Sequence, residues 1–205
     1  CFALAARYAG RLTRPLLIMT TGLIGTGKST IAEGVAAALA LRLLSSDRIR
    51  KARAGLVPET PQRVAYGAGL YSAATSAQTY ETLAALARAA LQQGESVMVD
   101  AAFPKQAQRE LLQAVAVEVG AECHLIECLA PETVIRERLE QRVRQPETIS
   151  DGRWAIFPQF QQNYEPVQEM KGACHIRLDA TQPIESCIEQ ALAAIQKGRA
   201  EYDRD

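Results

Sequence analysis

A short glycine-rich stretch offers the clearest chemistry in this sequence. Residues 22–30 read GLIGTGKST and contain the spacing G-x-x-x-x-G-K-[ST]. Glycines let a backbone pass close to phosphate oxygens with its N–H groups pointing inward, and the lysine and the hydroxyl that follow supply a cation and a ligand for Mg²⁺. We therefore predict a phosphate-binding loop for ATP and Mg²⁺, with Lys28 catalytic and Ser29 a metal ligand. Its nucleotide-binding residues are Gly22, Leu23, Ile24, Gly25, Thr26, Gly27, Lys28, Ser29 and Thr30.

The segments on either side of this stretch are those that such a loop requires. The apolar residues 16–20 come just before it and predict a buried strand. Residues 28–40 follow, with Ile31, Val35 and Leu39 on one face of an expected helix. The N-terminus of that helix would direct its partial positive charge at the phosphates. A coincidental glycine turn would not require this strand and helix around it.

Two candidate residues follow the second expected strand, residues 41–44. Asp47 would emerge at the carboxyl edge of the sheet, facing the γ-phosphate, where a hydroxyl acceptor needs a group to take its proton. Arg50 lies one helical turn later and could hold an anionic part of that acceptor. In the alternative interpretation, Ser46 or Asp47 only caps the next helix and the basic residues around it are solvated.

Asp100 ends the third expected strand, residues 96–100. It occupies the place of a carboxylate that holds Mg²⁺ through water, although a purely structural aspartate is the alternative. The next residue is Ala101, whereas motor ATPases usually place a water-activating glutamate there. This favours transfer to a bound acceptor over hydrolysis. The absence of an Asn-Lys-x-Asp motif also argues against a GTPase.

Arginines gather on the expected helix at residues 131–144, just before a polar segment at residues 144–153. Arg138 and Arg142 are four residues apart and therefore share one helical face. Arginines carried by a closing lid stabilise charge on a transferring phosphoryl group, so we predict that both are catalytic and that 144–153 is the lid. The alternative is an ion-paired surface helix, which Glu137, Glu140 and Glu147 would allow.

Strands and helices alternate along the chain, which is typical of a parallel sheet covered on both faces. The last two strands are expected at residues 124–129 and 174–178. Ligands of such sheets bind at the carboxyl ends of the strands. A glycine- and proline-containing segment at 55–75 would be the substrate loop. The helices are expected at 28–40, 46–54, 76–93, 105–119, 131–144 and 184–197.

Composition limits the remaining classes. The 205 residues suit one α/β domain, expected at 15–198, with 1–14 the tail of an upstream segment and 199–205 a C-terminal tail. Lysine plus arginine and aspartate plus glutamate are each 23, which predicts no extended nucleic-acid surface, and no apolar run approaches membrane-spanning length. Five unclustered cysteines favour reduced thiols and a cytoplasmic location. The only histidines, His124 and His175, suit packing better than catalysis.

The motifs together resemble the P-loop small-molecule and polynucleotide kinase group, in particular gluconate-kinase-like ATP-binding domains fused behind aminoglycoside-phosphotransferase-like domains. The resemblance extends from the N-terminus to Asp179. The stretches that carry it are residues 22–30, 46–51, 66–71, 97–103 with Arg109, the arginine helix, 150–151 and 164–166. Where relatives commonly read Asp-Ala-Thr, this chain has alanine at position 102, which loses a hydroxyl near the acceptor or the metal.

The resemblance implies a three-layer P-loop fold with a parallel five-stranded sheet of order 2-3-1-4-5, Asp47 as general base and an upstream fused domain as a partner. Tyr71 and Arg109 join Asp47 and Arg50 as expected acceptor-binding residues. Two functions remain open. The first is a phosphotransferase that moves the γ-phosphate of ATP to a hydroxyl of a small molecule or nucleotide end. The second is a non-catalytic ATP-sensing module of a larger protein.

Overall fold

The computed structural model describes residues 14–57, 60, 67–143, 152–170 and 172–202. Five parallel strands form one sheet in the order β2-β3-β1-β4-β5, which confirms the order implied by the resemblance. The strands are β1 (Leu16–Thr21), β2 (Arg42–Ser45), β3 (Val97–Asp100), β4 (Glu122–Leu129) and β5 (His175–Asp179).

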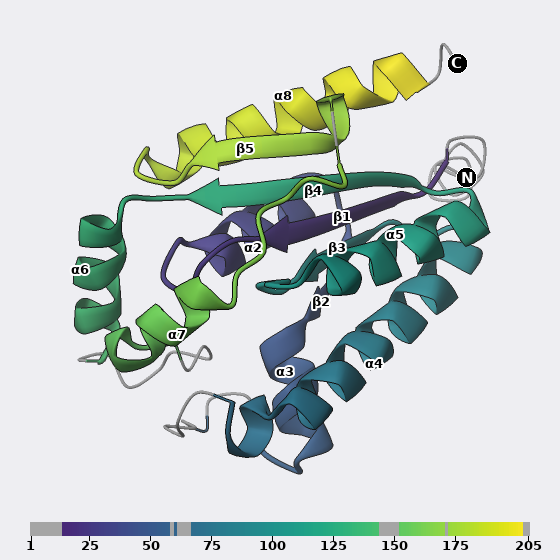
Figure 1. Cartoon of the computed structure of the whole chain (residues 1–205). Helices are drawn as coiled ribbons and strands as arrows, with labels where there is room; N and C mark the ends of the chain where they lie inside the picture. The colour runs from purple at the N-terminus through teal and green to yellow at the C-terminus, as the bar shows by residue number, and fades with distance from the viewer. Residues whose placement is uncertain (1–13, 58–59, 61–66, 144–151, 171, 203–205) are drawn as a thin grey trace.

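The helices cover both faces of this sheet (Figure 1). The longer ones are α2 (Lys28–Ala38), α3 (Ser46–Arg53), α4 (Ala73–Gln92), α5 (Gln106–Val119), α6 (Glu132–Val143) and α8 (Ile184–Tyr202). A shorter helix, α7 (Phe157–Gln162), and three 3₁₀ turns, Gly69–Tyr71, Trp154–Ile156 and Gly172–Cys174, were not expected from the sequence. Residues 199–202, expected in a C-terminal tail, continue α8. Among the described helices, none is long and apolar enough to cross a membrane.

The central strand β1 is buried along its whole length, and its side chains divide between two cores. Leu17 and Met19 point to one side and pack with residues of α4 and α5, such as Leu83 and Leu112. Leu16 and Ile18 belong to the other core, which α2 and α8 complete. Because successive side chains of a strand face opposite sides, a continuous apolar run is what a strand covered on both faces requires.

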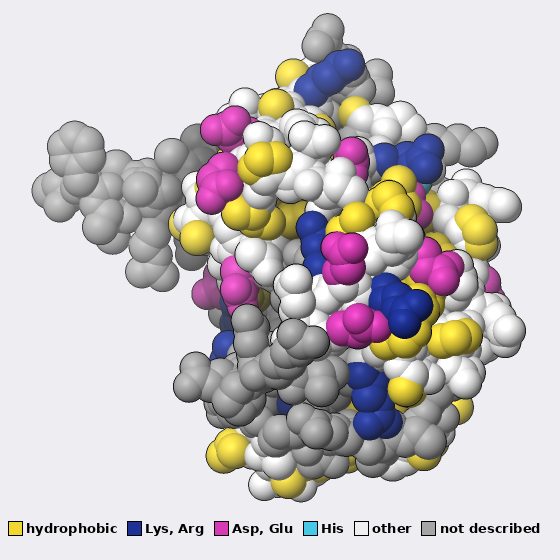
Figure 2. Space-filling model, turned by 90° about the vertical axis from the view of Figure 1, so that its left-hand side faces the viewer, with side chains coloured by type: hydrophobic (Ala, Val, Ile, Leu, Met, Phe, Trp, Pro, Cys, Tyr) yellow, Lys and Arg dark blue, Asp and Glu magenta, His cyan; other side chains and the backbone are white. Residues whose placement is uncertain are grey.

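All strands being parallel, their carboxyl ends share one edge of the sheet. The loops after β1, β2, β3 and β5 therefore start from that edge, where ligands of such folds bind. Figure 2 views the molecule from the side of α6, toward which the arrowheads of the strands point in Figure 1. Acidic and basic side chains are interspersed among the described residues of this face.

The packing of α2 on α8 gives a first prediction. A Cβ on Gly34 of α2 would lie 2.2 Å from Cδ1 of Ile188. We expect Gly34→Leu to lower the free energy of unfolding by about 1–3 kcal/mol, because overpacking forces the two helices apart. Urea unfolding would measure this loss. Adding Ile188→Ala should recover part of it, and Ala37→Leu, at an exposed position of the same helix, is the control. Unchanged stability of Gly34→Leu would contradict this close packing.

Candidate functional site

The glycine-rich loop lies between β1 and α2, where the sequence predicts it. Gly25 and Gly27 have φ angles of +82° and +87°, a region that favours glycine. A Cβ on Gly22 would lie 2.5 Å from the backbone oxygen of Cys128, and one on Gly25 would lie 2.9 Å from Leu139. The loop thus requires glycine at these positions for backbone conformation and for close approach to β4 and α6.

Lys28 is the first residue of α2, and its side chain folds back along the loop. Its Nζ donates to the carbonyl oxygen of Leu23 at 2.7 Å. Burial lowers the pKa of Lys28, and the cation of Arg142 acts in the same direction, whereas Asp100 and Asp47 act against it. Lys28 therefore lies within electrostatic range of three other predicted site residues, which belong to α3, β3 and α6.

The two predicted metal ligands lie together. The side chains of Ser29 and Asp100 form a hydrogen bond, although they are 71 positions apart in the sequence. Asp100 is only 9% exposed, and burial raises its pKa in spite of the hydrogen bond from Ser29 and the charge of Lys28. A hydroxyl and a desolvated carboxylate are hard oxygen donors that suit Mg²⁺. The residues present therefore fit the metal that the sequence predicts.

On the other side of the loop, Asp47 and Arg50 form an ion pair, with Nη1 of Arg50 2.8 Å from Oδ1 of Asp47. The guanidinium of Arg50 also lies over the ring of Tyr71, 4.6 Å from its centroid. Arg50 is 6% exposed, and its Nε has no hydrogen-bond partner among the described residues. The structure thus brings Asp47, Arg50 and Tyr71 together at the end of β2, with one buried N–H donor left unsatisfied.

The two predicted arginines of α6 face different neighbours. Nη2 of Arg138 donates to the backbone oxygen of Ala180, just after β5, at 2.7 Å. Burial lowers the pKa of Arg142, while the carboxylate of Asp47 opposes that shift. Arg142 is therefore near the residues at the end of β2, whereas Arg138 is anchored on the opposite side of the loop. Most of the predicted lid, residues 144–151, lies outside the described residues.

A pocket of about 320 Å³ lies between the glycine-rich loop, α6 and the turn from β5 to α8. This volume is at the lower end of the range for small-molecule sites and would fit part of a nucleotide. Among the lining residues are Gly25, Arg138, Arg142, Ala180, Gln182 and Cys187. The last three were not predicted from the sequence. The position of this turn, directly after a parallel strand, is the signal that could have found them.

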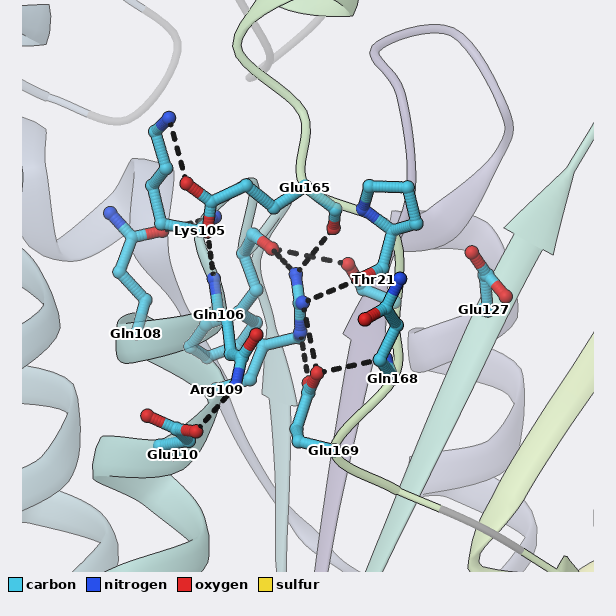
Figure 3. Close-up of polar contacts among 12 residues, drawn as sticks. Thr21, Lys105, Gln106, Gln108, Arg109, Glu110, Glu127, Glu165, Gln168 and Glu169 are labelled. Carbon is cyan, nitrogen blue, oxygen red and sulfur yellow. Dashed lines mark hydrogen bonds and ion pairs between the residues drawn. The ribbon is translucent and has the colours of Figure 1, made fainter.

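Arg109 corrects the sequence analysis, which placed it among the acceptor-binding residues. It is fully buried and forms an ion pair with Glu169 (Figure 3). Its Nη1 donates to Phe103 O and Glu165 O at 2.9 and 3.1 Å, and Nη2 donates to Pro166 O at 3.3 Å. The prediction was wrong because the first turns of α5 face the segment after α7, so the guanidinium is used within the protein.

The histidines and buried cysteines do not form a second reactive centre. His124 pairs with Glu122 inside β4, and His175 pairs with Glu127 at the start of β5. Burial raises the pKa of the Cys128 thiol to about 12. Within the described ranges, no group of three or more His, Cys, Asp or Glu residues could hold a metal ion.

Comparison with known proteins supports a kinase-like fold. Residues 17–167 match the AAA domain family. Uncharacterised proteins of Mycobacterium tuberculosis and Mycobacterium bovis are 29% identical over 126 residues, which is 62% of this chain but only 25% of theirs. A gluconokinase from Sinorhizobium meliloti has a TM-score of 0.66 and 18% identity over 94% of this chain and 99% of its own. The APS kinase CysC of Mycobacterium tuberculosis, in complex with AMPPNP and APS, has a TM-score of 0.62 and 22% identity. The match covers 90% of this chain and 99% of that kinase.

The buried carboxylate of Asp100 gives the second prediction. The pKa of Asp100 is higher in the folded than in the unfolded protein, so ionised Asp100 lowers the free energy of unfolding at every pH above its pKa in the unfolded protein. This loss of stability becomes smaller as the pH falls through the pKa of the folded protein. We expect Asp100→Asn to raise the free energy of unfolding of the metal-free protein at pH 7. The same variant should lose most of the increase in nucleotide affinity that Mg²⁺ produces.

Thermal unfolding in EDTA and calorimetric titration of an ATP analogue, with and without Mg²⁺, would measure the two effects. Glu95→Gln, which alters an exposed ion pair with Arg42, is the control. A destabilised Asp100→Asn protein that keeps its full response to Mg²⁺ would contradict both parts.

Proposed function

Because the chain belongs to the AAA domain family, and because its loop, lysine and oxygen ligands meet at one edge of a kinase-like sheet, we propose that it is an ATP-dependent phosphotransferase. The acceptor would be a hydroxyl of a small molecule or of a nucleotide end. The observation that carries the proposal is the position of Asp47, a carboxylate within electrostatic range of both Lys28 and Arg142. A nucleotide-binding module without transfer chemistry would not need a carboxylate there.

The residues divide the chemical work in this proposal. The backbone of the glycine-rich loop binds the phosphates of ATP, and Mg²⁺ held near Ser29 and Asp100 would neutralise their charge. Asp47 accepts the proton from the acceptor hydroxyl, the resulting oxygen attacks the γ-phosphorus, and ADP leaves. Lys28 and Arg142 stabilise the negative charge on the transferring phosphoryl group. Arg138 holds the nucleotide side, because it adjoins the pocket next to Ala180.

Arg50 favours an acceptor with an anionic group. Its ion pair with Asp47 leaves Nε without a partner in a buried position, and a carboxylate or phosphate oxygen could accept from it. An unsatisfied buried donor is costly, so binding of such an oxygen would remove an existing penalty. The ring of Tyr71 against the guanidinium fixes the plane in which an anion has to approach. These contacts support a phosphorylated or carboxylated alcohol as the substrate class.

The alternative is an ATP-sensing module of a larger protein. The chain spans about a quarter of the length of the mycobacterial relatives that it matches, so the whole protein's activity could depend on segments outside this chain. An upstream fused domain is the partner that this alternative requires. Loss or retention of transfer after changing Asp47 separates the two functions.

The third prediction concerns Asp47. Asp47→Asn keeps the size of the side chain but removes the proton acceptor, so we expect phosphoryl transfer to fall about 10²–10⁴-fold. Nucleotide affinity should change little, because Asp47 does not belong to the glycine-rich loop. Transfer from radiolabelled ATP to a panel of phosphorylated and carboxylated alcohols would be compared with calorimetric binding of an ATP analogue.

Glu95→Gln again serves as the surface control. Wild-type transfer by Asp47→Asn would assign Asp47 to helix capping. Tight nucleotide binding by the wild type without transfer to any acceptor of the panel would favour the sensing module.

The fourth prediction separates the two arginines of α6. We expect Arg138→Met to weaken nucleotide binding, since it removes a cation that borders the pocket. Arg142 borders the same pocket but also lies within electrostatic range of Asp47, so Arg142→Met should lower kcat as well as nucleotide affinity. Removing a charged contact to a phosphate or nucleotide commonly costs a factor of about ten or more. Arg136→Met, which changes an exposed residue of the same helix, is the control. Equal effects of Arg138→Met and Arg142→Met on kcat and on nucleotide affinity would contradict this division.

A further inference from the structure

The stretch that follows Asp100 has an unusual backbone. Phe103 has a φ of +40°, although it is neither glycine nor a small polar residue, and its side chain is fully buried. Bulky residues rarely adopt this region, and such conformations persist only where surrounding contacts impose them. The contacts that hold Phe103 are therefore part of what positions Asp100, three residues earlier.

The backbone oxygens of this stretch bind the end of β1 and the first glycine of the loop. The hydroxyl of Thr21 donates to Ala102 O at 3.0 Å and to Phe103 O at 3.3 Å. The N–H of Gly22 also donates to Ala102 O, at 3.3 Å. Any shift of residues 101–103 would therefore be transmitted to the first residue of the glycine-rich loop as well as to Asp100.

The second donor to Phe103 O is Arg109, and this side chain is itself held from the opposite direction. Nε and Nη2 of Arg109 bind the two carboxylate oxygens of Glu169, while Glu165 O and Pro166 O accept from its remaining donors. Burial raises the pKa of Glu169, but the hydrogen bonds from Arg109 and from backbone N–H groups outweigh it and hold the pKa below its usual value. The pair is thus a charged and bidentate contact.

Apart from Phe103 O, the acceptors of Arg109 belong to one segment, residues 163–170, which we call the strap. The carboxylate of Glu165 accepts from the backbone N–H of Gln106 at 2.7 Å and from Nζ of Lys105 at 3.1 Å (Figure 3). The hydroxyl of Tyr164 lies 3.3 Å from that of Thr21 and donates to Glu127 at 3.2 Å. The strap is therefore attached to the start of α5 and to the ends of β1 and β4, and Arg109 connects it to Phe103.

We propose that Arg109, clamped by Glu169 of the strap, is a positioning residue that imposes the left-handed conformation of Phe103 and thereby places Asp100 beside Ser29 for Mg²⁺. Arg109 touches neither the pocket nor the predicted metal ligands. It acts through the backbone oxygen of Phe103, and the ring of Phe103 packs on Tyr80, with 5.0 Å between the centroids. The part that concerns Mg²⁺ rests on the proposed function, whereas the part that concerns Phe103 does not.

The test uses Arg109→Lys, which keeps the positive charge but cannot reproduce the planar fork that reaches Phe103, Glu169 and the strap together. Hydrogen exchange of residues 98–104, measured without nucleotide or metal, should become faster than in the wild type. The gain in affinity for an ATP analogue on adding Mg²⁺ should fall roughly tenfold, the size typical of losing a group that orients a metal ligand. Affinity in EDTA should fall less than this, because only Gly22, the first residue of the glycine-rich loop, is bonded to residues 101–103.

Two further variants keep the test decisive. Thr21→Val removes the hydroxyl that donates to Ala102 O and Phe103 O. It should also speed the exchange of residues 98–104 and weaken the response to Mg²⁺. This variant replaces Arg109→Lys if the lysine variant does not fold. Glu122→Gln is the matched control, since it alters a buried hydrogen bond to His124 at the far end of β4 and should leave both readouts unchanged.

Unchanged exchange of residues 98–104 in a folded Arg109→Lys protein would overturn the proposal, as would an unchanged response to Mg²⁺. If the wild type itself shows no response to Mg²⁺, the proposed function fails, and hydrogen exchange still decides whether Arg109 holds Phe103.

Discussion

The site depends on one close approach of backbone to backbone, at Gly22. Its N–H donates to Ala102 O, and its Cα faces Cys128 O so closely that a Cβ would lie 2.5 Å away. The start of the loop is thereby held between the end of β3 and the end of β4, the two strands that flank β1. Since a phosphate-binding loop acts through fixed N–H directions, the neighbouring strands, and not only the loop itself, determine where those N–H groups point.

A balance of charge sets the chemistry around this loop. Lys28 lies within electrostatic range of Asp47 and Asp100, and Arg50 and Arg142 interact with Asp47. Burial disfavours the ionised forms of Lys28, Asp100 and Arg142 alike. For each of these groups, a nearby charge of opposite sign offsets part of the cost of burying the ionised form. A magnesium ion and a chain of phosphates carry opposite charges that would fit the same arrangement. The protein groups are therefore already placed where the charges of the substrate have to be neutralised.

The sequence predicts well what depends on local pattern and poorly what depends on a contact between distant segments. The apolar run of β1, the spacing of residues 22–30 and the aspartate ending β3 each reflect a local requirement, and the structure places them as expected. Arg109 has no such signature, because its partners Glu165, Pro166 and Glu169 lie 56 to 60 positions later. A basic residue early in a helix looks the same in sequence whether it binds a substrate or a buried carboxylate.

Stability alone does not explain why a buried ion pair, Arg109–Glu169, holds the strap. Such a pair seldom adds net stability over apolar side chains of similar size. An apolar residue at position 109 could pack against the strap, but it could not donate to Phe103 O, Glu165 O and Pro166 O in three fixed directions. The guanidinium supplies those directions, and Glu169 compensates the charge that they require. What Arg109 adds is therefore the orientation of backbone oxygens on both sides of it. Orientation matters most at Phe103, where the backbone would otherwise relax from a conformation that it does not prefer.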